Sequence, residues 1–145
     1  MIVYRICQTY PPGHDPIDGM GSFRNGGGWN SKGTHAVYTA SSLALARSEL
    51  ARHINLESIP DGFRVYEIEI PDEPYQIINP LPKGWNNDPP LPITQLLGDK
   101  YLRNTKIAGI KVSSVCDPNS FNYILNPLSI YFDQVKARRN YIFTP

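Results

Sequence analysis

The sequence predicts an α+β fold, with a single domain over residues 1–145 that contains a bent, mainly antiparallel sheet and two or three helices. Short segments of alternating polarity recur along the chain, whereas helical spacing is confined to two segments. The content of 14 Pro and 9 Tyr residues is high, which favours loops and strands over a helical bundle. A length of 145 residues suits one domain, which can bury about two-thirds of the surface of the unfolded chain.

The N-terminal part is predicted to contain one strand and then a long loop. Residues 2–7 alternate with the period of a strand, and Arg5 is set on the face opposite Ile2, Tyr4 and Ile6. A loop rich in Gly, Pro and Asp is expected to follow as far as about Trp29.

A short strand and the first helix are predicted next. Residues 36–39 are β-prone, and Ser41 or Ser42 can cap a helix that extends to Ile54. On this helix Glu49 lies at the edge of the apolar stripe rather than opposite to it.

The second half predicts further strands and one more helix. Residues 63–70 alternate cleanly, with Tyr66, Ile68 and Ile70 directed inward. The proline-rich segment 80–92 is expected to be irregular, and Thr94 can cap a helix that reaches Leu102. The remaining predicted strands cover residues 75–78, 107–112, 123–125 and 141–143.

Charge and hydropathy argue against several classes of partner. The formal net charge is +1, and the basic residues form no stripe of the kind that binds a nucleic-acid backbone directly. No apolar run approaches the roughly 18 residues that span a bilayer, and the start lacks a signal-peptide pattern. The sequence therefore predicts a cytoplasmic protein without direct contact to nucleic acid or membrane.

The residues alone leave the chemistry open. His14, His35 and His53 have no metal-ligand spacing, so no metal is predicted. The stretch GGGWN at residues 26–30 is not a P-loop, because no GK[ST] follows it. Its backbone could approach a phosphate or a ribose closely, or it could simply be a turn.

Six segments together resemble a known family. In chain order they are VYRIC, GGGWNSKGTHAVYTASSLALARSE, LPKGW, TQLLGDKYL, IKVSSV and NYILNP. From Val3 to Pro127 they resemble the RES domain. The resemblance implies an ADP-ribosyltransferase-like fold and a toxin of a bacterial type II toxin–antitoxin pair. Such toxins consume NAD as a substrate, so no cofactor is implied.

The resemblance also implies partners and a range of reactions. It implies a homodimer within a complex with an Xre-type helix-turn-helix antitoxin. NAD would be cleaved at the nicotinamide–ribose bond by hydrolysis, by phosphorolysis or by ADP-ribosyl transfer, and the sequence leaves open whether the acceptor is water, phosphate or protein.

Site residues follow from the same resemblance. It places catalytic roles on Tyr38, Glu49 and Ser114, and on the position occupied by Gly28. Glu49 would stabilise the oxocarbenium ion, Tyr38 would wall the nicotinamide, and Ser114 would bind ligand or orient Glu49. The residues implied to bind NAD are Arg5, Arg24, Gly27, Trp29, Asn30 and Asn126.

Gly28 departs from the family pattern, which usually has an arginine at this position. The loop thus lacks a guanidinium that could bind the diphosphate of NAD. Arg24 or Arg5 could substitute, or the change could mark an inactive member or an engineered substitution. The alternative hypothesis is accordingly a catalytically inactive RES-fold binding module that retains antitoxin binding and weak nucleotide binding.

Overall fold

The computed structural model describes residues 1–9 and 15–145, which fold around a seven-stranded sheet of order β4-β5-β6-β2-β1-β3-β7. All strand pairs are antiparallel except β4–β5. The predicted α+β fold with a mainly antiparallel sheet is therefore confirmed. The strands are β1 (Ile2–Gln8), β2 (Val37–Ala40), β3 (Phe63–Glu69), β4 (Tyr75–Ile77), β5 (Gly109–Ser113), β6 (Phe121–Leu125) and β7 (Lys136–Ile142).

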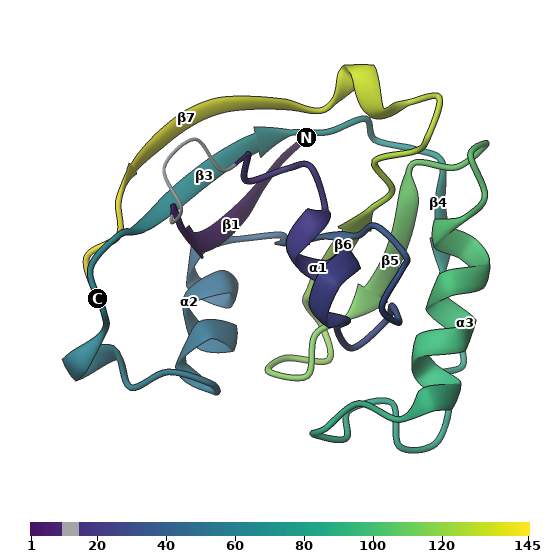
Figure 1. Cartoon of the computed structure of the whole chain (residues 1–145), viewed down its shortest axis with the longest axis horizontal. Coiled ribbons are helices and arrows are strands. Elements are labelled where there is room, and N and C mark those ends of the chain that lie inside the picture. The colour runs from purple at the N-terminus through teal and green to yellow at the C-terminus, as the bar shows by residue number, and fades with distance from the viewer. Residues whose placement is uncertain (10–14) are drawn as a thin grey trace.

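The sheet is nearly divided between β1 and β2. These strands pair only through Tyr4 and Ala40, whereas β1 and β3 pair along the whole of β1. One half of the sheet consists of β1, β3 and β7, and the other of β2, β6, β5 and β4 (Figure 1). The two halves diverge from the single pairing position, which bends the sheet.

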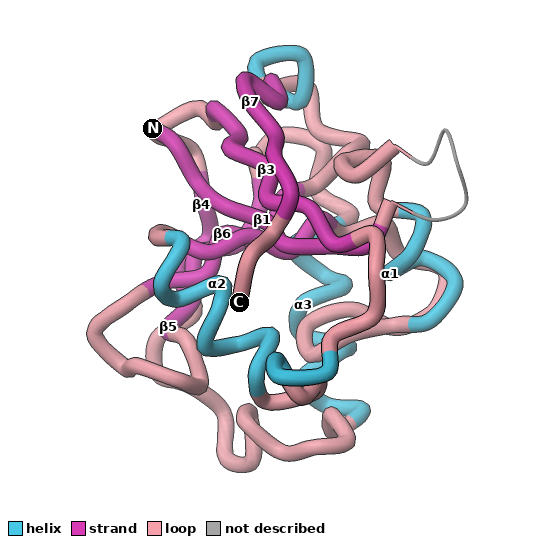
Figure 2. Tube along the Cα trace, turned by 90° about the vertical axis from the view of Figure 1, so that its left-hand side faces the viewer, coloured by secondary structure: helices cyan, strands magenta, loops and turns pink. Residues whose placement is uncertain are grey.

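Two longer helices cover one face of this bent sheet. The helices are α1 (Met20–Asn25), α2 (Leu43–Ala51) and α3 (Pro92–Leu102). Helix α2 packs on Ala40 of β2, and α3 packs on Ile124 of β6, whose pairing partner is Tyr38. Since Tyr38 and Ala40 are two residues apart on one strand, both helices lie on the same face. Figure 2 shows them below β1 and β3.

Several predicted elements are confirmed in detail. Ser42 caps α2, because its hydroxyl accepts the Leu45 N–H at 3.1 Å. In β3 and at the residue directly after it, the three side chains predicted to point inward are buried, namely Tyr66, Ile68 and Ile70. In β1, however, Val3 is fully buried on the face assigned to Arg5, because β1 is a central strand with both faces covered.

The prediction of a continuous loop up to Trp29 is wrong for residues 20–25, which form α1. The Asp18 carboxylate accepts the Met20 N–H at 2.9 Å, and Gly19 has a left-handed φ of 74° that turns the chain into the helix. The Phe23 ring then stacks 4.4 Å from the His35 ring. A helix of six residues is too short to show a helical period.

Three predicted boundaries are also wrong. Helix α2 ends at Ala51 rather than at Ile54. Helix α3 begins at Pro92, so Thr94 lies inside the helix and does not cap it; proline suits the first turn of a helix. Strand β7 begins at Lys136 rather than at residue 141. It pairs with β3 through the backbone, and charged side chains interact across the two strands, including Arg139 Nε and Glu67 Oε2 at 3.3 Å, so it has no apolar alternation.

Helix α3 holds the glycine-rich loop along its length. Gln95 Nε2 donates to the Gly27 carbonyl at 2.9 Å, and Asp99 Oδ1 accepts the Ser31 N–H at 2.9 Å. A Cβ added at Gly98 would lie 1.7 Å from the Trp29 carbonyl oxygen. The absent side chain at Gly98 therefore lets the helix contact the loop backbone directly.

We predict that Gly98→Ala lowers the free energy of unfolding by about 1–3 kcal/mol, because helix and loop must separate. Gly21→Ala in α1 is the matched control, since a Cβ there meets no atom within 4 Å. That variant should gain about 0.5–1 kcal/mol. Urea denaturation measures both, and equal stability of the two variants would contradict the close packing of α3.

Candidate active site

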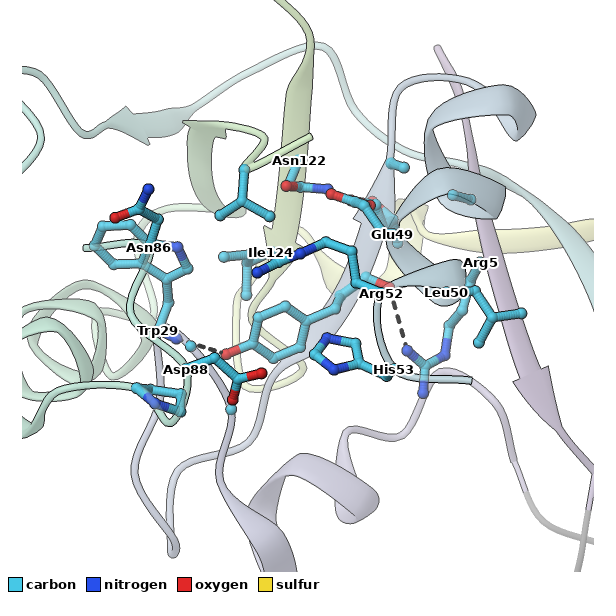
Figure 3. A pocket seen from close by; sticks show the side chains of 18 of the residues that line it. Arg5, Trp29, Glu49, Leu50, Arg52, His53, Asn86, Asp88, Asn122 and Ile124 are labelled. Atoms are coloured by element: carbon cyan, nitrogen blue, oxygen red, sulfur yellow. Dashed lines mark hydrogen bonds between the residues drawn. The ribbon is translucent and has the colours of Figure 1, made fainter. Parts of the chain in front are cut away.

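A cavity of about 440 Å³ opens where β1 and β2 diverge (Figure 3). Its walls come from residues 4–6 of β1, residues 38–40 of β2, the end of α2, residues 27–29, and the segment from Trp85 to Pro90. The volume lies within the range of about 300–1,000 Å³ for small-molecule sites. The cavity is thus large enough for a nucleotide-sized ligand.

Glu49 is held at this cavity by one side chain of β6 and one that directly follows β5. Ser114 Oγ donates to Glu49 Oε2 at 2.8 Å, and Asn122 Nδ2 donates to Oε1 at 2.9 Å. Burial raises the pKa of Glu49, while the hydrogen bonds from Ser114 and Asn122 and the charge of Arg52 oppose that rise. The carboxylate is therefore oriented and partly desolvated, and α2 is the element that carries it.

Ser114 contacts Glu49 and does not reach the cavity surface. It is 1% exposed and is not among the cavity-lining residues. Its oxygen accepts the Cys116 N–H at 3.1 Å while its hydroxyl proton is directed at Glu49. Of the two roles implied for Ser114, the structure shows the orienting contact.

Tyr38 lines the cavity and fixes the glycine-rich loop. Its hydroxyl donates to Asn30 Oδ1 at 2.7 Å and accepts the Trp29 N–H at 2.9 Å. Burial raises the pKa of Tyr38, so the phenol remains protonated. A Cβ at Gly27 would lie 2.7 Å from the Tyr38 hydroxyl oxygen, so glycine is required there.

Gly28 differs from Gly27 because it faces open space. A Cβ added at Gly28 meets no atom within 4 Å, and the residue lines the cavity. The backbone of this position can therefore carry a side chain that enters the cavity.

Arg5 bridges the gap between the diverging strands. Its Nη1 donates to the Tyr38 carbonyl at 3.2 Å, which supplies that carbonyl with a donor from β1. Its Nε is buried and has no partner within the described part of the chain. Arg5 also lines the cavity, so it both braces the site and borders the open space.

Three residues that the resemblance implied to bind NAD do not line the cavity, namely Arg24, Asn126 and Asn30. Arg24 is exposed on the last turn of α1 and does not line the cavity. Asn126 is fully buried after β6, where it donates to the Asn104 carbonyl and accepts the Leu128 N–H. It stabilises the turn that contains Pro127 and Leu128, which is ordinary Asn-Pro chemistry. Asn30 is buried and positions Tyr38.

The cavity also contains residues that the sequence analysis missed. Figure 3 shows Arg52 and His53 at the end of α2, with Asn86 and Asp88 on the opposite side. The sequence contained one indication for Arg52, because this residue lies about one helical turn after Glu49 and is therefore expected on the same side of the helix. The segment from Trp85 to Pro90 carried no signal, since an irregular proline-rich connection has no period that indicates which side chains converge.

Residues 1–9 and 15–145 contain no group of three His, Cys, Asp or Glu side chains arranged to hold a metal ion. His14 lies outside the described residues. In the same part of the chain, no helix combines the length and apolarity that crossing a membrane requires.

Comparison with known proteins gives consistent matches over most of the chain. The family model described as RES domain matches residues 2–142. A protein of Sphingobium sp. (strain YBL2) named Prs ADP-ribosylating toxin is 33% identical over 138 residues, which cover 90% of this chain and 86% of that protein. A Yersinia enterocolitica protein named Toxin Res is 36% identical over 111 residues, covering 75% of this chain and 73% of its own length.

A solved structure shares the fold. A chain of the M. tuberculosis MbcT-MbcA toxin-antitoxin complex superposes with a TM-score of 0.74 at 17% identity, covering 99% of this chain and 84% of that chain. At this level of identity the match concerns the fold alone.

We predict that Glu49→Gln gains stability relative to the parent as the pH rises from about 4 to about 7. The folded-state pKa of Glu49 lies above its ordinary value, so the stability linked to its protonated form is present at low pH and lost as pH rises through that pKa. Glutamine removes this loss. Melting temperatures across the pH series measure the effect, and a difference that shrinks with rising pH would contradict the raised pKa.

Proposed function

This chain belongs to the RES domain family, and on that premise we propose that it is an enzyme that cleaves the nicotinamide–ribose bond of NAD. Its biological role would be that of a toxin in a bacterial toxin–antitoxin pair. The carrying observation is the Glu49 carboxylate, which Ser114 and Asn122 hold at the wall of a nucleotide-sized cavity. Relatives named as toxins, one of them ADP-ribosylating, support the assignment.

Glu49 would stabilise the charge that develops during cleavage. The bond between the nicotinamide nitrogen and the anomeric carbon breaks, and nicotinamide departs with the electron pair as a neutral molecule. The ribose is left with oxocarbenium character, which a fixed carboxylate stabilises electrostatically or by holding a ribose hydroxyl. Water, phosphate or a protein nucleophile then forms the new bond and gives up its proton.

Tyr38 and Arg5 would position the substrate. The Tyr38 ring lines the cavity and offers an aromatic face to the cationic nicotinamide. Its hydroxyl is engaged by Asn30 and Trp29 and has a raised pKa, so it is unsuited to act as a base. Arg5 retains donors that the Tyr38 carbonyl does not use.

An Xre-type helix-turn-helix antitoxin is the proposed partner, in a complex that contains a homodimer of this chain. The fold shared with a chain of a toxin–antitoxin complex supports an antitoxin partner. We place this action in the cytoplasm, because NAD and a DNA-binding antitoxin are both found there.

Gly28 favours a second candidate, a catalytically inactive binding module of the same fold. The cavity lacks a side chain at this position, although a Cβ there would meet open space. The two candidates differ in turnover and in the response to an arginine at residue 28.

The purified protein is expected to consume NAD, and Glu49→Gln is expected to slow that consumption by at least about 100-fold, because the fixed negative charge is lost. Glu57→Gln is the matched control, since Glu57 is exposed and outside the cavity. Chromatography of NAD, nicotinamide and the ADP-ribose product, with and without phosphate, measures turnover and identifies the acceptor. An unchanged rate in Glu49→Gln would refute the role of this carboxylate.

Gly28→Arg should raise NAD consumption by roughly one to four powers of ten, because a charge-assisted, bidentate contact to the diphosphate is added. Expression of this variant without antitoxin should harm a bacterial host. Gly28→Ala controls for the backbone, and Gly28→Lys supplies charge without the planar fork. If the folded arginine variant and the parent both leave NAD intact, the inactive binding module is the correct function.

A further inference from the structure

We propose that Arg52 binds the diphosphate of the dinucleotide in this cavity. The inference rests on the proposed use of NAD and assigns one step of its recognition to a residue at the end of α2.

The position of Arg52 is fixed by the helix that also carries Glu49. Arg52 is the C-terminal cap of α2, and its N–H donates to the Glu49 carbonyl at 3.2 Å. From this anchor the side chain reaches across the cavity, in the direction of the side that carries Asn86 and Asp88 (Figure 3). The guanidinium therefore lies where a bound ligand would pass.

No other side chain or carbonyl group of the described residues accepts a hydrogen bond from the Arg52 guanidinium. Among residues 1–9 and 15–145 it makes no side-chain hydrogen bond and no salt bridge. Neither Glu49 nor Asp88, the carboxylates at the cavity, forms an ion pair with it. All five of its N–H groups thus remain available to an anionic ligand.

Other cationic groups are less suited to this role. Arg5 commits one nitrogen to the Tyr38 carbonyl and has its Nε buried. Arg24 does not line the cavity. Arg52 is exposed and lines the cavity, so its guanidinium is accessible to a ligand that enters the cavity.

The spacing from Glu49 matches the chemistry of a dinucleotide. The diphosphate is attached to the same ribose whose anomeric carbon reacts, so a diphosphate-binding group must stand close to the carboxylate. Arg52 is three residues after Glu49, and its charge acts to lower the Glu49 pKa, which shows that the two groups are within electrostatic reach. A planar guanidinium can bind two phosphate oxygens at once.

The test is calorimetric binding of ADP-ribose to the parent, Arg52→Ala, Arg52→Lys and Arg47→Ala. Arg47 is the matched control, because it is an exposed arginine of the same helix that does not line the cavity. Arg52→Ala should bind about tenfold more weakly than the parent or worse, with a smaller dependence on salt. The affinity of Arg52→Lys should lie between those of the parent and Arg52→Ala, since lysine keeps the charge but cannot bind two phosphate oxygens with a planar guanidinium. Arg47→Ala should stay within about twofold of the parent.

Two outcomes would overturn the inference, and they are distinguishable. Equal affinity of Arg52→Ala and Arg47→Ala for ADP-ribose would remove Arg52 from the site and leave the proposed function intact. Failure of the folded parent to bind ADP-ribose at millimolar concentration would overturn both.

A double-mutant cycle with Gly28→Arg checks that the contact is to the ligand rather than to the fold. Both positions line this cavity, so an arginine at residue 28 should reach the same diphosphate, and Arg52→Ala should then lower the affinity less in the Gly28→Arg background than in the parent. A merely structural role of Arg52 would leave the two effects additive, and additivity would contradict a shared diphosphate.

Discussion

The divergence of β1 from β2 is the constraint on which the rest of the structure depends. These strands share a single pairing position, Tyr4 with Ala40, in the centre of the sheet. A gap at this point exposes backbone groups that a regular ladder would pair, and the Arg5 guanidinium compensates by donating to the Tyr38 carbonyl. The same gap opens the cavity to side chains from both halves of the sheet. Arg5 therefore stabilises the gap between the strands and also lines the cavity.

The glycine-rich loop is positioned rather than flexible. Helix α3 contacts it through Gln95 and Asp99, and its backbone at Trp29 is bound by the Tyr38 hydroxyl. The two neighbouring glycines differ in the space around them, because a Cβ at Gly27 would collide with Tyr38 whereas a Cβ at Gly28 would not meet any atom. A loop held at so many points presents its backbone to the cavity without further ordering, which lowers the entropic cost of binding.

The sequence could predict what local patterns encode. Alternation located β3, and a capping serine located the start of α2. The edge position of Glu49 on its helix was also readable, and it explains how the carboxylate reaches Ser114 and Asn122. Strand β7 was largely missed because charge pairs replace apolar alternation along it. The convergence of Arg52 with segment 85–90 was missed because it depends on tertiary packing, for which no local period exists.

Helix α2 unites the two charges that the proposed chemistry needs. Glu49 is directed at the sheet, where Ser114 and Asn122 fix it, while Arg52 at the helix end points across the open cavity. Because Glu49 lies in the last turn of α2 and Arg52 caps the same helix, their backbone positions are fixed relative to each other independently of the glycine-rich loop. The absence of a side chain at Gly28 therefore leaves the cavity with a carboxylate and a guanidinium already in place. An arginine at residue 28 would add a second guanidinium to the cavity that Arg52 lines, so its effect on affinity must depend on whether Arg52 is present.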